Sequence, residues 1–281
     1  MINFRQYSNL TKVVIPNSVI LTNTNFSSAF MNLKNLKEIE LPASVTAINS
    51  AFNNCSNLTR AICGDQTVGV ADAYYNCRNA TIAVCGPSVT NMSRTYAYCN
   101  SLSTAVCGPN VTTMPNTYRD CLSLMTAACG PNVTNMTNTY LNCSSLTTAV
   151  CGDNVTQMYN TYENCSKLEK AVFGNSVAYV SYAYKGCPNI KGNVYLQSNN
   201  IYNVYGCFSG RNTSSRLNIY VTNNSETHRV IKGTYGSSGN LTGSSVTWYT
   251  NTATGVTYNN NVNIYIYPVA NVEEARIANG D

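Results

Sequence analysis

Cysteine is the residue type in this sequence that is both reactive and regularly spaced. The 281-residue chain has 13 cysteines, and they fall in two series that recur every 22 residues, apart from a last step of 20 to Cys207. The first series is Cys55, Cys77, Cys99, Cys121, Cys143, Cys165, Cys187 and Cys207, and the second is Cys63, Cys85, Cys107, Cys129 and Cys151. This spacing indicates repeat positions rather than pairs.

The spacing of these cysteines does not suit catalysis or metal binding. A cysteine nucleophile needs a nearby base that lowers its pKa, and the single histidine, His228, lies outside the repeats. A cysteine metal site needs short Cys-x-x-Cys units, whereas here the gaps alternate between 7 and 13 residues. The carboxylates occupy mixed repeat positions, so no acid and base pair is visible. We therefore expect no enzymatic activity, no metal and no cofactor.

The composition excludes further classes of protein. Only 10% of the residues are charged and the net charge is +5, without a basic run, which argues against a nucleic-acid partner. No stretch of about 18 apolar residues is present, so we expect no transmembrane segment. The first twelve residues, MINFRQYSNLTK, lack the apolar region of a secretory signal.

Other residue columns keep the same 22-residue step, and a fixed period of this size predicts a solenoid. A glycine column follows the second cysteines. An aromatic column contains Phe52, Tyr74, Tyr96, Tyr118, Tyr140, Tyr162 and Tyr184, preceded by Phe30 and Phe4, and a leucine column contains Leu58, Leu102, Leu124, Leu146 and Leu168, preceded by Leu10 and Leu36. We count nine turns between Leu10 and Ile190, with a four-residue insertion before Leu36.

The least degenerate turn, Leu36 to Pro42, indicates which side chains face inward. Alternation along a strand places Ile39 and Leu41 inside and Glu40 outside. Leu41 occupies the position of the second cysteines, and Leu33 lies 22 residues before Cys55. Because apolar residues stand where the cysteines later stand, we interpret the thiols as small core hydrophobes and expect them to be free and mostly buried.

The pattern Leu-x-x-Ile-x-Leu-Pro-x-x-Val-x-x-Ile-x-x-x-Phe-x-x-Cys-x-x-Leu, from Leu36 to Leu58, resembles the BspA-like leucine-rich repeat family over roughly residues 4 to 210. The resemblance implies an α/β solenoid with a short parallel strand in each turn and a short helical or 3-10 segment on the other face. It also implies a role in attachment, because such repeats occur in microbial surface proteins and in phage tail-associated proteins. From the fourth turn onward the Leu-x-Leu-Pro segment has become Ala-Val-Cys-Gly-Pro, and these smaller core residues imply thinner, tightly stacked turns.

A parallel β-helix is the alternative fold, because its turns can be equally long. It requires alternation around the whole turn. The segment that contains Met136, Tyr140 and Cys143 has spacings of 4 and 3 residues, which is helical rather than strand spacing. We therefore favour the leucine-rich repeat.

The periodicity ends near Gly210, which divides the chain into a solenoid of about nine to ten turns, residues 1–210, and a β-rich C-terminal module, residues 211–281. Alternation predicts strands at 217–221 and 262–267 and weaker strands at 246–249 and 256–258. Glu273 and Glu274 are expected to begin a polar tail. The module is either a small β cap over the last turn or a recognition tip.

One set of candidate site residues forms an uncharged outward stripe on the strands. It is flanked by threonines and consists of Ile62, Val84, Val106, Ala128, Val150 and Val172. At a strand spacing of roughly 4.8 Å the stripe is about 25 Å long. Strand propensity alone would also place valine and threonine here. The functional interpretation is a docking surface for a protein or a host-surface glycan.

A regular threonine array suggests an ice-binding face as a less favoured alternative. Its members are Thr90, Thr112, Thr134 and Thr156, with Thr95, Thr117, Thr139 and Thr161. They are expected in the turn-and-helix half of each repeat, and not on a flat strand.

The second set of candidate residues lies at the N-terminal end. Phe4, Leu10, Val13 and Ile15 match the core positions of a full turn, and no polar capping segment precedes them. An uncovered first turn would expose apolar surface and unpaired strand groups, which solenoids and sheet edges normally avoid. We expect another subunit to dock at this end.

The sequence therefore predicts a non-enzymatic recognition or attachment protein with two possible settings. The favoured setting is a phage tail or virion, because particles that leave by lysis need no export signal. The alternative is a bacterial cell-surface adhesin whose export signal is absent from this sequence.

Overall fold

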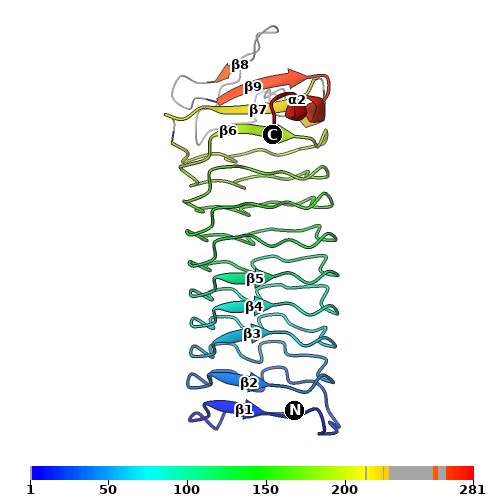
Figure 1. The fold of residues 1–281 in the computed structure, drawn as a ribbon, viewed down its shortest axis with the longest axis vertical. Helices are drawn as coiled ribbons and strands as arrows, with labels where there is room; N and C mark the ends of the chain where they lie inside the picture. The colour runs from blue at the N-terminus through cyan, green and yellow to red at the C-terminus, as the bar shows by residue number, and fades with distance from the viewer. Residues whose placement is uncertain (1, 213, 224, 228–255, 259–263) are drawn as a thin grey trace.

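The computed structural model describes residues 2–212, 214–223, 225–227, 256–258 and 264–281. His228 and the strand expected at 246–249 lie outside these ranges. The repeats stack as flat coils into a long, nearly straight rod, with the N-terminus at one end and the C-terminal elements at the other (Figure 1). The predicted leucine-rich repeat solenoid is confirmed.

Parallel strands on one face of the rod carry the 22-residue repeat. They are β1 (Lys12–Val14), β2 (Glu38–Glu40), β3 (Arg60–Ile62), β4 (Ile82–Val84) and β5 (Thr104–Val106). Ala61 pairs with Ala83 and Ala83 with Ala105, which is a step of one repeat. Lys12 pairs with Glu38 across the predicted four-residue insertion. Neighbouring coils are therefore in register.

The aromatic column is a continuous stack of rings along the core. Successive ring centroids lie 4.9 to 5.9 Å apart, and the ring planes differ by at most 15°. The stack begins at Phe4 and continues beyond the predicted column to Phe208. Since consecutive coils place equivalent side chains about 5 Å apart, large aromatic rings fill the core with few gaps.

The arc opposite the strands differs from the implied helical segment. In residues 2–212 it consists of successive turns. Backbone N–H groups alternate along it: Thr139 donates to Met136 in its own coil, whereas Tyr140 donates to Thr161 in the next coil. Because every second donor bonds to the next coil, an α-helix cannot form, and the 4 and 3 spacing reflects turns rather than helix.

Asparagine explains how this arc turns. Two positions in each coil have a left-handed backbone, and asparagine adopts that conformation more readily than most residues. In one column the amides also bond from coil to coil: Asn54 donates to Asn32 at 3.0 Å, and Asn164 donates to Asn142 at 2.9 Å. Positive φ angles occur in this column at Asn32, Asn54, Asn76, Tyr98, Asp120, Asn142 and Asn164.

A single glycine reverses the faces of the strand at the end of the rod. Gly192 has a φ of +81°, and it opens β6 (Gly192–Leu196). Val172 is outward, but Val194, 22 residues later, is fully buried, and Tyr195 takes the outward side instead. The alternation of inward and outward side chains therefore changes by one position at Gly192, which exchanges the two faces of the strand.

The C-terminal elements form one sheet with β6. Its strand order is β6, β7 (Leu217–Thr222), β9 (Ile264–Val269) and β8 (Val256–Tyr258), and β8 alone is antiparallel. The strands predicted at 217–221, 256–258 and 262–267 are thus confirmed with small shifts. The prediction of a polar tail was wrong: Glu273 and Glu274 lie in α2 (Val272–Ala278). Asn271 caps this helix by accepting the N–H of Glu273 at 2.9 Å, a start signal that the Asn-x-Glu-Glu sequence contains.

Candidate functional site

The outward stripe lies where the sequence predicted it, on the strand face. Ile62, Val106 and Val172 are 40%, 49% and 37% exposed. The other three members, Val84, Ala128 and Val150, are half-buried. The register pairs Ile62 with Val84 and Val84 with Val106, so the side chains form a row along the rod.

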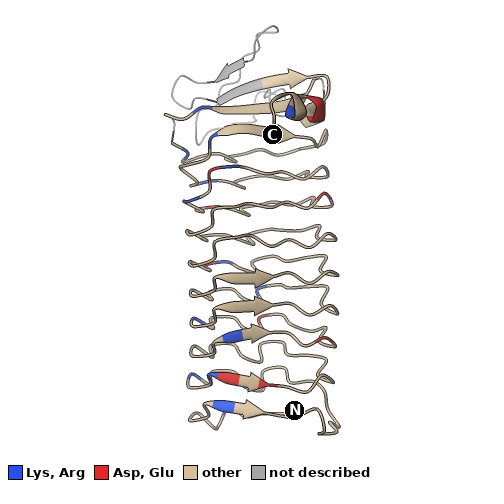
Figure 2. Ribbon diagram, viewed as in Figure 1, with Lys and Arg blue, Asp and Glu red and all other residues tan. Residues whose placement is uncertain are grey.

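Charged side chains are concentrated beside this row and at its ends. Lys12, Glu38, Glu40 and Arg60 lie on β1 to β3, and the Nζ of Lys12 is 2.8 Å from a carboxylate oxygen of Glu38. Strands β4 and β5 carry no charged residue (Figure 2). The middle of the stripe is therefore an uncharged surface of valine, alanine and threonine.

Tyrosine hydroxyls of the core column hold the backbone of this row. Tyr96 donates to the carbonyl of Val84 at 2.9 Å. The hydroxyl of Tyr184 donates to the carbonyl of Val172 at 2.6 Å and accepts the N–H of the same residue at 2.8 Å. Tyr140 bonds to Ala128 and Tyr162 to Val150 in the same two-sided way.

This bonding explains where the regular strands end. Beyond β5 the outward residues Ala128, Val150 and Val172 exchange both backbone hydrogen bonds with a tyrosine hydroxyl instead of with the next coil. Segments 126–128, 148–150 and 170–172 are accordingly not strands, and only the bridge between Thr126 and Thr148 remains. The predicted strand in each turn is therefore reduced here to an extended segment.

The thiols are free, and ten of the thirteen are buried. In the first series, from Cys55 to Cys187, each Sγ lies 3.0 to 3.2 Å from the carbonyl oxygen of an aromatic residue in the preceding coil. Cysteine therefore fills the core and also donates a weak hydrogen bond, which the sequence interpretation missed. Burial raises the pKa of Cys99 and of Cys143 to about 12, so these thiols stay protonated and unreactive at neutral pH.

Cys207 does not continue the first cysteine series. The N–H of Tyr184 donates to the carbonyl of Cys207, just as the N–H of Tyr162 donates to that of Ala183. Cys207 therefore takes the position of Ala183, where four other coils have a threonine and earlier coils have an alanine. Those threonines, Thr95, Thr117, Thr139 and Thr161, are fully buried, which removes them from any ice-binding face.

The N-terminal end exposes more apolar surface than the sequence indicated. Phe4, Leu10, Val13 and Ile15 are partly buried against the core. Four other side chains of the first coil are far more exposed: Tyr7 at 52%, Val14 at 47%, Val19 at 42% and Ile20 at 94%. The predicted subunit contact at this end stays a prediction.

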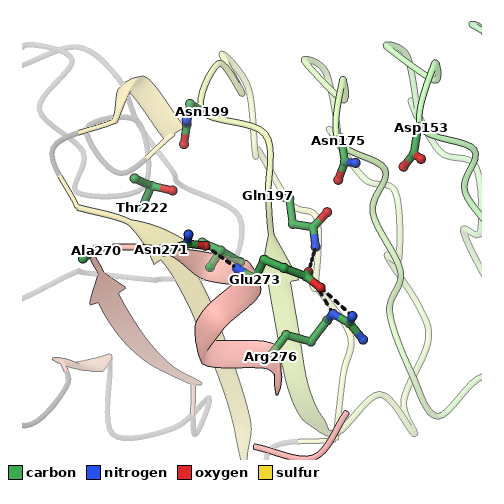
Figure 3. Close-up of a pocket in the computed structure, with 10 residues that line it drawn as sticks. Asp153, Asn175, Gln197, Asn199, Thr222, Ala270, Asn271, Glu273 and Arg276 are labelled. Carbon is green, nitrogen blue, oxygen red and sulfur yellow. Dashed lines mark hydrogen bonds and ion pairs between the residues drawn. The ribbon is translucent and has the colours of Figure 1, made fainter. Parts of the chain in front are cut away.

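A polar pocket of about 720 Å³ lies between the last coils and α2. Sequence reasoning did not find it, because its walls come from segments far apart in the chain. Asp153 and Asn175 come from neighbouring coils, Gln197 follows β6, Thr222 ends β7, and α2 supplies Glu273 and Arg276 (Figure 3).

Charged groups on the α2 wall of this pocket neutralise each other. Arg276 bonds to Glu273 through Nε at 2.9 Å and Nη2 at 2.6 Å, and its Nη1 donates to the carbonyl of Asp281 at 2.6 Å. Glu273 also accepts from Gln197 at 2.6 Å. The pKa of Glu273 is lowered chiefly by its hydrogen bond from Arg276, so the carboxylate stays ionised and paired.

Neither a metal cluster nor a membrane-spanning helix is present in the described residues. No three His, Cys, Asp or Glu side chains among them lie close enough to share a metal ion. None of the helices in this part of the chain combines the length and apolar character that crossing a membrane requires.

Comparison with known proteins places the chain in a family. The model of the BspA type leucine rich repeat region matches six copies over residues 3–125 and 93–215. No curated protein matches the chain. Similar solved structures are leucine-rich repeat proteins of T. pallidum (TpLRR), Bacteroides ovatus and, as a leucine-rich cell surface protein, Faecalibacterium prausnitzii A2-165.

These three structures are distant in sequence. The T. pallidum protein is 13% identical, and the match covers 64% of this chain and 73% of that one with a TM-score of 0.41. For the Bacteroides ovatus protein the identity is 14%, the coverage 77% and 80%, and the TM-score 0.30. For the Faecalibacterium prausnitzii protein the identity is 19%, the coverage 76% and 73%, and the TM-score 0.45. The family match spans most of the chain and coincides with the coils described above. This protein belongs to the BspA-type leucine-rich repeat family.

Proposed function

We propose that this protein is a non-enzymatic attachment protein that docks a protein partner on the outward stripe. The observation that supports the proposal is the uncharged row from Ile62 to Val172, whose backbone is held from within by tyrosine hydroxyls at every member except Val106. A rigid surface loses little conformational entropy on binding. Contiguous exposed apolar side chains on a soluble protein mark interaction surfaces.

The chemistry of the row suits a partner with an apolar, uncharged surface. A charged side chain of the partner would lose its hydration against valine and alanine without gaining an ion pair. Charges at the N-terminal strands, such as Lys12 and Glu38, would then set the position of the partner at the rim. Leucine-rich repeat proteins generally act through such interactions and not through catalysis.

The setting that we propose lies outside the cytoplasm. A phage tail or virion is one such place, and a bacterial cell surface is the other. Membership of the BspA-type family supports surface presentation. Mass spectrometry of purified particles and of cell-envelope fractions separates the two settings, because the protein would be enriched in only one of them.

Glutamates introduced into the stripe test the docking role. Val106→Glu with Val150→Glu should leave the circular dichroism spectrum unchanged and weaken binding to target cells at least about tenfold, because two charges would be buried at the interface. The matched control is Val68→Glu with Leu122→Glu, since both residues are exposed apolar side chains off the row. Equal binding by the two double variants would contradict the proposal.

A further inference from the structure

The pocket beside α2 combines a large volume with unused hydrogen-bonding groups. Its volume of about 720 Å³ is typical of small-ligand sites. The side chains of Asp153, Asn175, Asn199 and Thr222 line it, and none of them has a hydrogen bond or an ion pair within the described residues. Figure 3 shows these groups arranged around the space between the coils and the helix. They supply amide donors and acceptors, a carboxylate and a hydroxyl.

The charges of the lining argue against an ionic ligand. The charge of Arg276 is already paired with Glu273, and three of its five N–H donors are engaged by Glu273 and by the carbonyl of Asp281. An anion would therefore find no free cation and would meet the carboxylate of Asp153. A divalent cation prefers six or more oxygen ligands, commonly with several carboxylates, whereas the pocket offers one unpaired carboxylate.

An apolar ligand is also a poor match for these walls. The apolar residues of the lining are Ala270 and Val272, and Val272 is buried. Burying unpaired amides and a hydroxyl under an apolar molecule would cost free energy, because those groups would lose their hydrogen bonds to water. A ligand that satisfies amides, a carboxylate and a hydroxyl without carrying charge is a polyhydroxylated molecule.

One position of the repeat has a different residue type in the coils that line the pocket. The residue after the glycine column is proline in three successive coils, at Pro87, Pro109 and Pro131, and it becomes Asp153 and Asn175 in the two coils that line the pocket. The fold tolerates proline at this position. The polar residues are therefore not required by the coil; Asp153 and Asn175 line the cavity, and Asp65 occupies the same column far from it.

We propose that this pocket binds a neutral carbohydrate, with Asp153, Asn175, Asn199 and Thr222 contacting its hydroxyl groups. The site is separate from the outward stripe and adds a second recognition surface to the proposed function. It makes the C-terminal module a recognition tip, because one wall of the pocket is α2. Sugar hydroxyls can donate to the carboxylate and to amide oxygens and can accept from amide N–H groups, which suits this polar lining.

The test begins with the full chain on an array of neutral, sialylated and sulfated oligosaccharides. The neutral members are built from glucose, galactose, mannose and N-acetylglucosamine. We expect at least one neutral glycan to bind, and its affinity is then measured by isothermal titration calorimetry. Binding of no neutral glycan, or of acidic glycans alone, would overturn the proposal. So would calcium binding at this site in the absence of glycan binding.

Variants then locate the binding. Asp153→Pro with Asn175→Pro restores the residue of the neighbouring coils, and should weaken binding at least about tenfold by removing two or more hydrogen bonds. Asp65→Pro makes the same change in the same column far from the pocket, and should leave affinity unchanged. Thr222→Val removes only a hydroxyl and should also weaken binding. Unchanged affinity in both pocket variants would overturn the proposal.

The glutamate double variant in the stripe separates this proposal from the docking role. We expect Val106→Glu with Val150→Glu to keep glycan affinity unchanged while it weakens attachment to cells. If the stripe variant binds cells normally and the pocket variants lose glycan binding, then the stripe proposal fails and the pocket proposal holds.

Discussion

The hydroxyl of Tyr184 forms two hydrogen bonds with the backbone of one residue, Val172: it accepts the N–H at 2.8 Å and donates to the carbonyl at 2.6 Å. A side chain of the core thus takes the place of a neighbouring strand. The side chain of Tyr184 thus does two things: its ring stacks in the aromatic column, and its hydroxyl fixes an outward residue of the stripe. Core packing and the shape of the candidate surface are consequently linked through one side chain.

This link predicts different effects for the same substitution at two tyrosines. Tyr184→Phe should lower the free energy of unfolding by about 2 kcal/mol, because the N–H and the carbonyl of Val172 would both lose their partner. Tyr118→Phe should be neutral or stabilising, because the buried hydroxyl of Tyr118 has no hydrogen-bond partner within the described residues. Urea unfolding of both variants is the measurement. Equal destabilisation by the two changes would show that the hydroxyl contacts do not matter.

The raised thiol pKa values predict a loss of stability in alkaline solution. Burial raises the pKa of Cys55, Cys99 and Cys143 to about 12, whereas an unfolded thiol titrates near about 8.5. Above that pH the unfolded chain binds fewer protons than the folded chain, so stability falls as pH rises. At pH 9.5 each such thiol should lower the free energy of unfolding by about 1.4 kcal/mol.

Thermal unfolding at pH 7.5 and 9.5 measures this effect. Cys143→Ala provides the control, because it removes one titrating thiol and should reduce the difference between the two pH values. The same burial predicts slow alkylation of the first series by iodoacetamide until the chain unfolds. A thiol of this series that reacts rapidly in the native protein would contradict the buried core.

The left-handed asparagine column predicts a difference between alanine and glycine at one site. Asn142 has a φ of +65°, donates to Asp120 at 2.8 Å and accepts from Asn164 at 2.9 Å. Asn142→Ala should cost about 2 to 3 kcal/mol, since alanine loses these bonds and strains the backbone. Asn142→Gly should cost less, because glycine adopts this conformation without strain. Denaturant unfolding that shows glycine to be the worse substitution would refute this explanation.

The exposed apolar residues of the first coil predict self-association or docking at the N-terminal end. Ile20→Asp with Val14→Asp should shift the protein toward monomer, because both side chains are largely exposed and would be buried in a contact. Sedimentation velocity over a concentration series measures the shift. Phe4→Asp and Ile15→Asp extend the test to the predicted residues. A wild-type chain that stays monomeric at high concentration would defeat a contact between copies of this chain.

The repeat of the sequence determined most of the rod. Each coil contacts only the coils beside it, so a residue that recurs every 22 positions must meet its own equivalents. For this reason the aromatic stack, the inward cysteines and the outward positions of Ile62 and Val106 could be assigned from spacing alone. Each side chain needs only to pack against its equivalents in the neighbouring coils. Because this requirement recurs in every coil, it is visible as a periodic pattern in the sequence.

Only the tertiary structure decided the features that break this regularity. Gly192 exchanges the two faces of β6 through its backbone angle. The pocket depends on the contact between Gln197 and Glu273, which lie 76 residues apart outside the 22-residue period. A change of backbone angle at one residue and the docking of a distant helix leave no periodic signal, because they occur once and are set by positions in space rather than by spacing along the chain.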